Sequence, residues 1–283
     1  MSDQTERRAE VLQGDCLEVM RTLPAESVDA VITSPPYAMQ RKTTYGGVPE
    51  AEYPAWTVSW MAEVRRLLKP DGSAVINIRP HVRNGQISDY TLRTRLALRD
   101  AGWAEVEELI WYKPGAAPLG HTGRPRRSYE SMHWFAKHGR PYCAPKAAGG
   151  PTSSVGHTKG RKGAHVHEHH EDSKEHRPGI ARVRDVVTLS TRANEPAHHL
   201  NAHPAPYPPA LAEWVGKLIC PPGGTILDPF SGSGSSGVAA LRLGCDYIGI
   251  DADAAYVEMS RRRLADPCSR LRSLPNLNRK DQS

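Results

Sequence analysis

A glycine-rich turn near the end of the chain limits the folds that this sequence can adopt. Gly232, Gly234 and Gly237 form a G-x-G-x-x-G pattern between a predicted strand and a predicted helix. The next strand-like run ends at Asp251, 19 residues after Gly232. A strand, a glycine turn, a helix and a second strand ending in a carboxylate form the crossover that binds nucleotides in parallel sheets. The pattern therefore predicts an α/β fold with a nucleotide-like ligand at this turn.

The rest of the chain alternates between strand and helix signals in the way that such a fold requires. Strands are predicted at residues 28–33, 73–78, 106–112, 225–228 and 247–251, and helices at 56–68, 91–101, 210–219, 235–243 and 254–264. Apolar residues recur with helical spacing in the second set, and β-branched residues dominate the first. We therefore expect a Rossmann-like, mostly parallel sheet with helices on both faces.

One segment does not fit this alternation. Residues 146–178 are rich in Gly, Ser, Lys and His and have almost no large apolar side chain, so burial cannot offset the entropy of ordering them. We predict a mobile loop within an inserted, partly disordered region. Six of the 13 histidines fall in residues 157–176, but their spacing matches no closed ligand set, so we predict no metal site.

Composition narrows the class of partner. The formal net charge is +6, and the basic residues concentrate at 111–146 and 261–283. Positive charge in these places suits a polyanion such as nucleic acid, although a solvated basic surface is the other interpretation. The five cysteines are scattered and form no C-x-x-C pair, and no apolar run is long enough to span a membrane. We expect a cytoplasmic protein with no membrane partner.

A second motif, Ser34-Pro35-Pro36-Tyr37, follows the apolar, β-branched run at 28–33. The two prolines end regular structure, which places the tetrapeptide on a loop at the carboxyl end of a strand. S-P-P-Y and the later D-P-F-x-G-S-G run together resemble the amino-methyltransferases of DNA. Their order in the chain resembles the β group of that family. Further matches are Gly14-Asp15-Cys16, just before the first predicted strand, Ser128-Tyr129-Glu130, and His203-Pro204-Ala205-Pro206-Tyr207-Pro208.

The resemblance covers about residues 11–264 and implies methyl transfer from S-adenosylmethionine to an exocyclic amino group in duplex DNA. It implies a catalytic role for Ser34, Pro35, Pro36 and Tyr37. It implies cofactor binding by Asp15, Asp228, Phe230, Ser231, Gly232, Gly234 and Asp251, with core packing as the other interpretation of Phe230. Ser at the first position of the tetrapeptide favours cytosine N4, and adenine N6 remains the alternative.

The chemistry of an amino group gives independent reasons for these residue types. Its lone pair is delocalised into the ring, so acceptors aimed at the N–H groups are needed to favour an amine-like nitrogen. The Ser34 hydroxyl and the Pro35 carbonyl are candidates, and Tyr37 would stack on a base flipped out of the duplex. Direct attack on the methyl group needs no metal. Pro267-Cys268 could offer a cysteine nucleophile, but it lies in an Arg-rich tail rather than after a core strand.

By the same resemblance the chain divides into a catalytic half at 1–112, a target-recognition region at 113–197, a cofactor-binding half at 198–265 and a basic tail at 266–283. Double-stranded DNA is the expected partner, and a cognate restriction endonuclease would be compatible with it. Trp111, Tyr112 and Trp134 fit the core better than a DNA surface. The DNA contacts that we predict are Lys113, Arg124, Arg126, Arg127 and Lys137.

Three other functions remain open at this point. An NAD-dependent oxidoreductase would explain the glycine turn and Asp251, but it leaves the Ser34–Tyr37 motif and the basic middle region unexplained. An RNA methyltransferase would use the same residues on another polymer. A non-catalytic DNA-binding protein would need the basic residues and should not bind S-adenosylmethionine.

Overall fold

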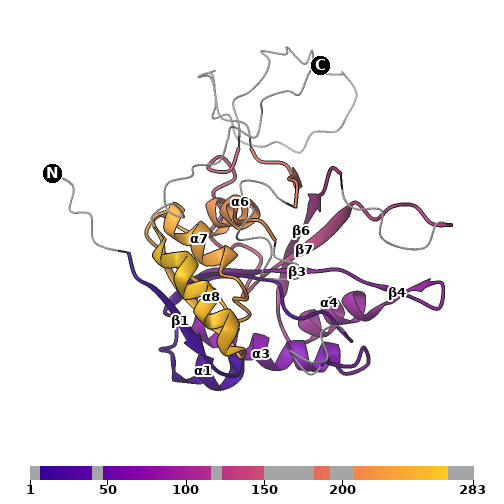
Figure 1. The fold of residues 1–283 in the computed structure, drawn as a ribbon, viewed down its shortest axis with the longest axis horizontal. Helices are drawn as coiled ribbons and strands as arrows, with labels where there is room; N and C mark the ends of the chain where they lie inside the picture. The colour runs from indigo at the N-terminus through magenta and orange to yellow at the C-terminus, as the bar shows by residue number, and fades with distance from the viewer. Residues whose placement is uncertain (1–6, 40–46, 116–122, 150–181, 192–206, 267–283) are drawn as a thin grey trace, which may run out of the picture.

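The computed structural model describes residues 7–39, 47–115, 123–149, 182–191 and 207–266 (Figure 1). Within these ranges an eight-stranded sheet runs in the order β1-β10-β9-β2-β3-β7-β6-β8. Its strands are β1 (Ala9–Gln13), β2 (Val28–Thr33), β3 (Leu68–Ile78), β6 (Ala104–Tyr112), β7 (Tyr129–Ala136), β8 (Val186–Thr188), β9 (Thr225–Asp228) and β10 (Asp246–Asp251). β4 (Val82–Arg83) and β5 (Gln86–Ile87) form a separate two-stranded hairpin.

Helices cover both faces of this sheet, as expected. The helices are α1 (Cys16–Thr22), α3 (Tyr53–Leu67), α4 (Tyr90–Asp100), α6 (Pro209–Ile219), α7 (Ser235–Arg242) and α8 (Ala254–Ala265). Figure 1 shows α6, α7 and α8 on one side of the sheet and α1, α3 and α4 on the other. Two apolar clusters follow this division, one around Trp214 of α6 and one around Trp60 of α3.

The predicted parallel sheet is confirmed for five neighbouring strands. β1, β10, β9, β2 and β3 pair in parallel, whereas β7 runs antiparallel to both β3 and β6. The predicted helices and strands are all present with small differences at their ends; for example, α3 begins at Tyr53, three residues before the predicted start. No helix in the described part of the chain is both long and apolar enough to cross a membrane.

One expectation about the chain needs correction. Gly14-Asp15-Cys16 does not precede the first strand, because β1 lies before it and α1 begins at Cys16. β7 and β8, which lie in the expected target-recognition region at 113–197, join the main sheet. Of the predicted mobile loop, residues 150–178 lie outside the described residues, as do Cys268 and the basic tail beyond residue 266.

Neighbouring connections of the sheet diverge at one edge, and we call the place outside the strand ends there the crevice. From β9 the chain continues into α7 on one face, and from the adjacent β2 it continues toward α3 on the other face. In parallel sheets, ligands bind where neighbouring connections diverge in this way, outside the carboxyl ends of the strands. Ser34 directly follows β2 and the glycine turn directly follows β9, so both sequence motifs border this crevice.

Candidate active site

The Ser34–Tyr37 loop is fixed by its neighbours on β3 and β7. The Ser34 hydroxyl donates a hydrogen bond of 3.2 Å to the main-chain carbonyl of Asn77. Ser34 Oγ also carries lone pairs that can accept further hydrogen bonds. The Tyr37 hydroxyl donates to Glu130 Oε2 over 3.0 Å. The loop therefore presents an acceptor at Ser34 and an aromatic ring whose hydroxyl is held in place.

A buried carboxylate lies behind this loop. Glu130 accepts from Lys113 Nζ at 2.6 Å and from the Asn77 side-chain amide at 2.9 Å. Burial alone would raise the pKa of Glu130, but Lys113, Asn77 and the nearby Arg79 outweigh it and hold the pKa below its usual value. Burial, with Glu130 adding to it, raises the pKa of Tyr37 well above its usual value. Glu130 is thus an anion and Tyr37 a neutral donor.

The glycine turn between β9 and α7 has a backbone that requires glycine. Gly232 and Gly234 have φ values of 52° and 78°, in the left-handed region. A Cβ atom at Gly234 would lie 2.4 Å from Ser260 Oγ. The Gly232 amide donates to Asp251 Oδ2 at 2.8 Å, and the Ser231 amide donates to the carbonyl of Ile250 at 2.8 Å. The turn is therefore bound tightly to the end of β10.

Asp228 lies at the end of β9, as the predicted strand at 225–228 placed it, with its carboxylate inside the protein. It is 1% exposed, and its carboxylate accepts hydrogen bonds from four groups inside the protein. The donors are Thr33 Oγ1 at 2.6 Å, Ser236 Oγ at 2.6 Å, the Phe230 amide at 3.1 Å and Tyr207 OH at 3.2 Å. Burial raises the pKa of Asp228 to about 6, although these hydrogen bonds act to lower it. Asp228 thus joins the β2 and β9 ends.

The other residues predicted to bind the cofactor surround the same crevice. Asp15 is exposed and caps α1, where its Oδ1 accepts from the amides of Leu17 and Glu18. The adjacent Gly14 amide donates to the Asp251 carbonyl at 3.0 Å, which brings the ends of β1 and β10 together. Phe230 is half-buried, with its ring 5.2 Å from that of Trp60 and 5.6 Å from that of Trp56.

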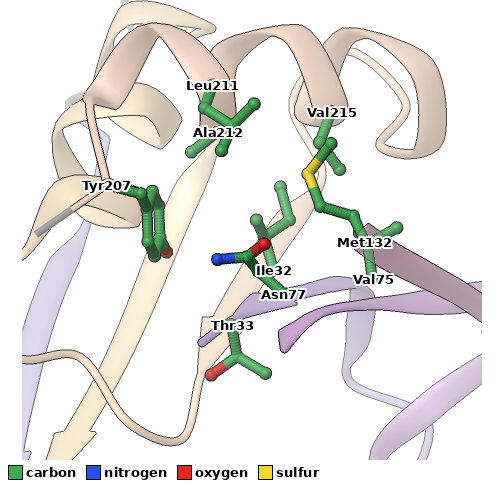
Figure 2. Close-up of a pocket in the computed structure, with 9 residues that line it drawn as sticks. All are labelled: Ile32, Thr33, Val75, Asn77, Met132, Tyr207, Leu211, Ala212 and Val215. Carbon is green, nitrogen blue, oxygen red and sulfur yellow. The ribbon is translucent and has the colours of Figure 1, made fainter. Parts of the chain in front are cut away.

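A small, mainly apolar pocket lies beneath α6, next to the ends of β2 and β3. Figure 2 shows Tyr207 on one side of the pocket and Met132 on the other, with α6 above them. Thr33 and Asn77 line it on the side of the catalytic loop. Asn77 Oδ1 is buried and has no hydrogen-bond partner among the residues that the structure describes. The pocket is therefore continuous with the residues that fix Ser34.

The predicted DNA contacts fall into two groups. Arg124 and Arg126 are exposed, and Arg127 is half-buried. The Arg124 guanidinium donates to the carbonyl of Gly85 in the β4–β5 hairpin, and that of Arg127 donates to the carbonyl of Pro80. Burial and then the charges of Arg79 and Arg124 lower the pKa of Arg127. These guanidiniums therefore lie close together, past the carboxyl end of β3.

The two predicted lysines lie elsewhere. Lys113 is 6% exposed and its ammonium is bound to Glu130, so it faces the interior instead of DNA. Lys137 follows β7, and its ammonium donates to the carbonyl of Leu68 at the start of β3, on the sheet edge opposite Ser34. Of the three aromatic residues assigned to the core, Trp111 and Trp134 are buried and Tyr112 is 42% exposed.

Sequence reasoning missed three residues of the site. Asn77 and Glu130 support the catalytic loop, and Tyr207 binds Asp228. A signal for Asn77 was present, because it is the one polar residue in the apolar run at 74–78. Glu130 and Tyr207 were noted only as parts of matching motifs, since nothing local indicates which strand end their side chains reach.

Comparisons with known proteins agree with this geometry. A family model described as DNA methylase, for N6 and N4 methyltransferases, matches residues 28–262. The type II methyltransferase M.PvuII of Proteus hauseri is 27% identical over 89% of this chain and 82% of its own length. M.SmaI of Serratia marcescens is also 27% identical, over 93% of this chain and 95% of its own length.

Solved structures show the same fold. The structure titled PvuII DNA methyltransferase (cytosine-N4-specific) has a TM-score of 0.73 and 25% identity, over 92% of this chain and 87% of that chain. The complex of M1.HpyAVI with S-adenosylmethionine has a TM-score of 0.61 and 19% identity, over 91% of this chain and 100% of that one. With the family model covering most of its length, this chain belongs to the N6/N4 DNA methylase family.

Proposed function

We propose that this protein transfers a methyl group from S-adenosylmethionine to the N4 amino group of cytosine in duplex DNA. The observation that carries the proposal is the position of Ser34. Its hydroxyl is hydrogen-bonded to the carbonyl of Asn77, and Ser34 directly follows β2, next to the strand that leads into the glycine turn. The cytosine-N4-specific title of the similar PvuII structure supports the choice of base.

The residues at the glycine turn fit such a cofactor. Gly232 has no side chain to separate the turn from a ligand, and Phe230 is half-buried, which leaves part of its side chain accessible to an adenine. The exposed Asp15 carboxylate could accept from an adenine amino group. For the ribose we propose Asp251, at the end of β10. When bound, S-adenosylmethionine supplies an electrophilic methyl group. Asp228 and Ser231 hold the turn rather than a ligand.

The residues on the β2 side would prepare the base. Ser34 Oγ and the Pro35 carbonyl accept the two N–H groups of the amine, which favours a nitrogen with an available lone pair. Proline restricts the backbone on either side, so the acceptors keep their direction without reorganisation. Tyr37 stacks on the flipped base and compensates part of the stacking lost from the duplex. The same acceptors would serve adenine N6, which is the alternative target.

The arginines beyond β3 suit a duplex partner. The charges of Arg79 and Arg124 act on Arg127, and the carbonyl groups to which Arg124 and Arg127 donate carry no charge to neutralise them. Phosphate groups would relieve this repulsion, and guanidiniums also suit the major-groove edge of guanine. We therefore propose Arg124, Arg126 and Arg127 as DNA contacts and withdraw Lys113 and Lys137.

The test is transfer of tritium from labelled S-adenosylmethionine to mixed-sequence duplex DNA, followed by digestion to nucleosides and chromatography. We expect label to elute with N4-methylcytosine. Label with N6-methyladenine would overturn the choice of base and keep the enzyme class. Absence of label from DNA, with label in an equal amount of RNA, would replace DNA with RNA as the substrate. Absence from both, with cofactor binding verified, would overturn the enzymatic function.

A further inference from the structure

We propose that Glu130 is a positioning residue of this methyltransferase, holding both Tyr37 and the Asn77 that fixes Ser34. The inference rests on the proposed function and adds a residue on β7, outside the two motifs that define the site. Glu130 does not border the glycine turn, and its role is to set the geometry of groups that meet the base.

Four side chains, from Tyr37, Asn77, Arg79 and Lys113, converge on this one carboxylate. Lys113 Nζ lies 2.6 Å from Oε1, and Arg79 Nη1 lies 3.8 Å from the same oxygen. The Asn77 amide lies 2.9 Å from Oε2, and Tyr37 OH lies 3.0 Å from it. The Glu130 side chain is 12% exposed. One oxygen thus faces the cations, and the other faces the catalytic loop.

This arrangement fixes two directions at once. The Tyr37 hydroxyl is held from one side by Glu130 and accepts from the Asn77 amide at 3.3 Å, so the three side chains form a closed triangle. The carbonyl of the same Asn77 accepts the Ser34 proton. Movement of Glu130 would therefore shift the stacking ring and the acceptor together. Errors of about 1 Å in such groups can cost on the order of 100-fold in rate.

A carboxylate is required here, and an amide of the same shape would not serve. An ionised carboxylate is acceptor-only, with two oxygens for its donors. The isosteric Gln would turn an NH₂ group either toward the Lys113 ammonium or toward the Asn77 amide, which can only donate, and in the second case the Tyr37 hydroxyl would lose the acceptor for its proton. Lys113, first expected to contact DNA, thus serves as the counter-charge that keeps the carboxylate ionised inside the protein.

The first test is Glu130→Gln in the full-length protein, with kcat and KM measured for DNA and for S-adenosylmethionine. We expect kcat to fall about tenfold to 100-fold, because the groups that meet the base lose their direction. The KM for S-adenosylmethionine should stay within about twofold, because its proposed residues lie on β1, β9 and β10. Unchanged kcat in a folded Glu130→Gln protein would overturn the proposal.

The matched control is Glu213→Gln. Glu213 is another buried carboxylate, 2.7 Å from a guanidinium nitrogen of Arg242, and it joins α6 to α7 away from the catalytic loop. We expect this change to lower the melting temperature and to leave kcat near that of the natural protein at a temperature where both are folded. An equal loss of kcat in both variants would mean that Glu130 acts only through stability.

A double-mutant cycle with Tyr37→Phe separates positioning from general destabilisation. Tyr37→Phe keeps the ring and removes the hydroxyl that Glu130 holds. We expect it to reduce kcat by itself, and the double variant to be little worse than Glu130→Gln alone. Full kcat in Tyr37→Phe, or multiplicative losses in the double variant, would overturn a role exerted through this hydroxyl.

If Glu130→Gln does not fold, the change Glu130→Gln with Lys113→Met removes the buried charge from both partners. Adding Tyr37→Phe to that background should then leave kcat unchanged, and a further fall would overturn the proposal. If the natural protein transfers no methyl group, the proposed function is wrong. The activity of the natural protein therefore tests the proposed function, and the ratio of kcat between variants tests the role of Glu130.

Discussion

Ser34 and Asp228 illustrate how single side chains make one site from two halves of the chain. Asp228 accepts from Thr33 Oγ1, the neighbour of Ser34, and also from Ser236 at the start of α7. An unpaired buried carboxylate would be costly, but four hydrogen bonds make Asp228 a fixed point between β2 and β9. The distance between the ends of β2 and β9 is therefore set partly by Thr33, which directly precedes Ser34 in the chain.

At this scale we predict the effect of Ser34→Ala. Loss of an acceptor from a preorganised site typically costs about 100-fold or more in kcat, so we expect a fall of that order. Binding of S-adenosylmethionine, measured by calorimetry, should be unchanged. Ser27→Ala is the control, since the Ser27 hydroxyl donates only to the carbonyl of Pro24 in an exposed turn. A kcat for Ser34→Ala within twofold of the natural value would contradict the role of this oxygen.

At the scale of elements, the packing of α7 onto β10 explains the last glycine of the motif. Gly237 lies in α7, where a Cβ atom would lie 2.6 Å from Tyr247 Cε1 and 2.8 Å from Leu264 Cδ2. Tyr247 is fully buried and its hydroxyl is 2.8 Å from Ser231 Oγ, so the ring cannot easily move. Absence of a side chain at Gly237 thus lets the helix approach the strand that ends at Asp251.

We therefore predict that Gly237→Ala destabilises the protein although it improves helix propensity. Propensity alone would favour Ala by about 1 kcal/mol. Overpacking of this kind costs about 1–3 kcal/mol, so we expect the net free energy of unfolding to fall. Urea denaturation would measure it, with Gly139→Ala as control because a Cβ atom at that glycine meets nothing within 4 Å. A rise in the urea midpoint of Gly237→Ala would show that the side chains of Tyr247 and Leu264 move to accommodate the added methyl group.

At the scale of the whole molecule, the pH dependence of stability includes a buried imidazole. His133 of β7 is 3% exposed, and burial, with Arg95 adding to it, lowers its pKa to about 4 from 6.5. Between these two values the unfolded chain binds more protons than the folded one. This contribution to stability is fully present above pH 6.5 and is lost as the pH falls through about 4.

We predict that His133→Gln makes the protein less sensitive to acid. The measurement is urea denaturation of both proteins at pH 7 and at pH 5. The natural protein should lose more of its free energy of unfolding across this interval than the variant, whatever their difference at pH 7. Equal losses would show that His133 does not remain neutral in the folded state.

The distribution of charge over the molecule leads to a prediction for DNA binding. Arg124 is exposed beyond the carboxyl end of β3, whereas Lys137 lies at the opposite edge of the sheet. If Arg124 neutralises one phosphate, Arg124→Gln should reduce the slope of log K against log salt by about 0.9. Lys137→Gln should leave the slope unchanged. Fluorescence anisotropy across a salt series would measure both, and the reverse result would place the DNA at the other edge.

The sequence by itself determined the fold class and the two motifs of the site. Apolar periodicity and glycine or proline positions are local properties, so strands such as β2 and β9 and the loops that follow them could be predicted from short segments. The resemblance then supplied the family, which the match over residues 28–262 confirms. The roles of Ser34 and Tyr37 remain a proposal that these motifs suggested and that the geometry supports.

Only the tertiary structure decided which groups meet across the sheet. Lys113 was expected to contact DNA, and the antiparallel pairing of β6 and β7 instead brings it against Glu130, 17 residues away. Asp228 looked like a ligand-binding carboxylate until Thr33, 195 residues earlier, was placed against it. Such contacts depend on strand order and register, which no short segment encodes. The sequence therefore determined the parts of the site, and long-range packing decided what each part does.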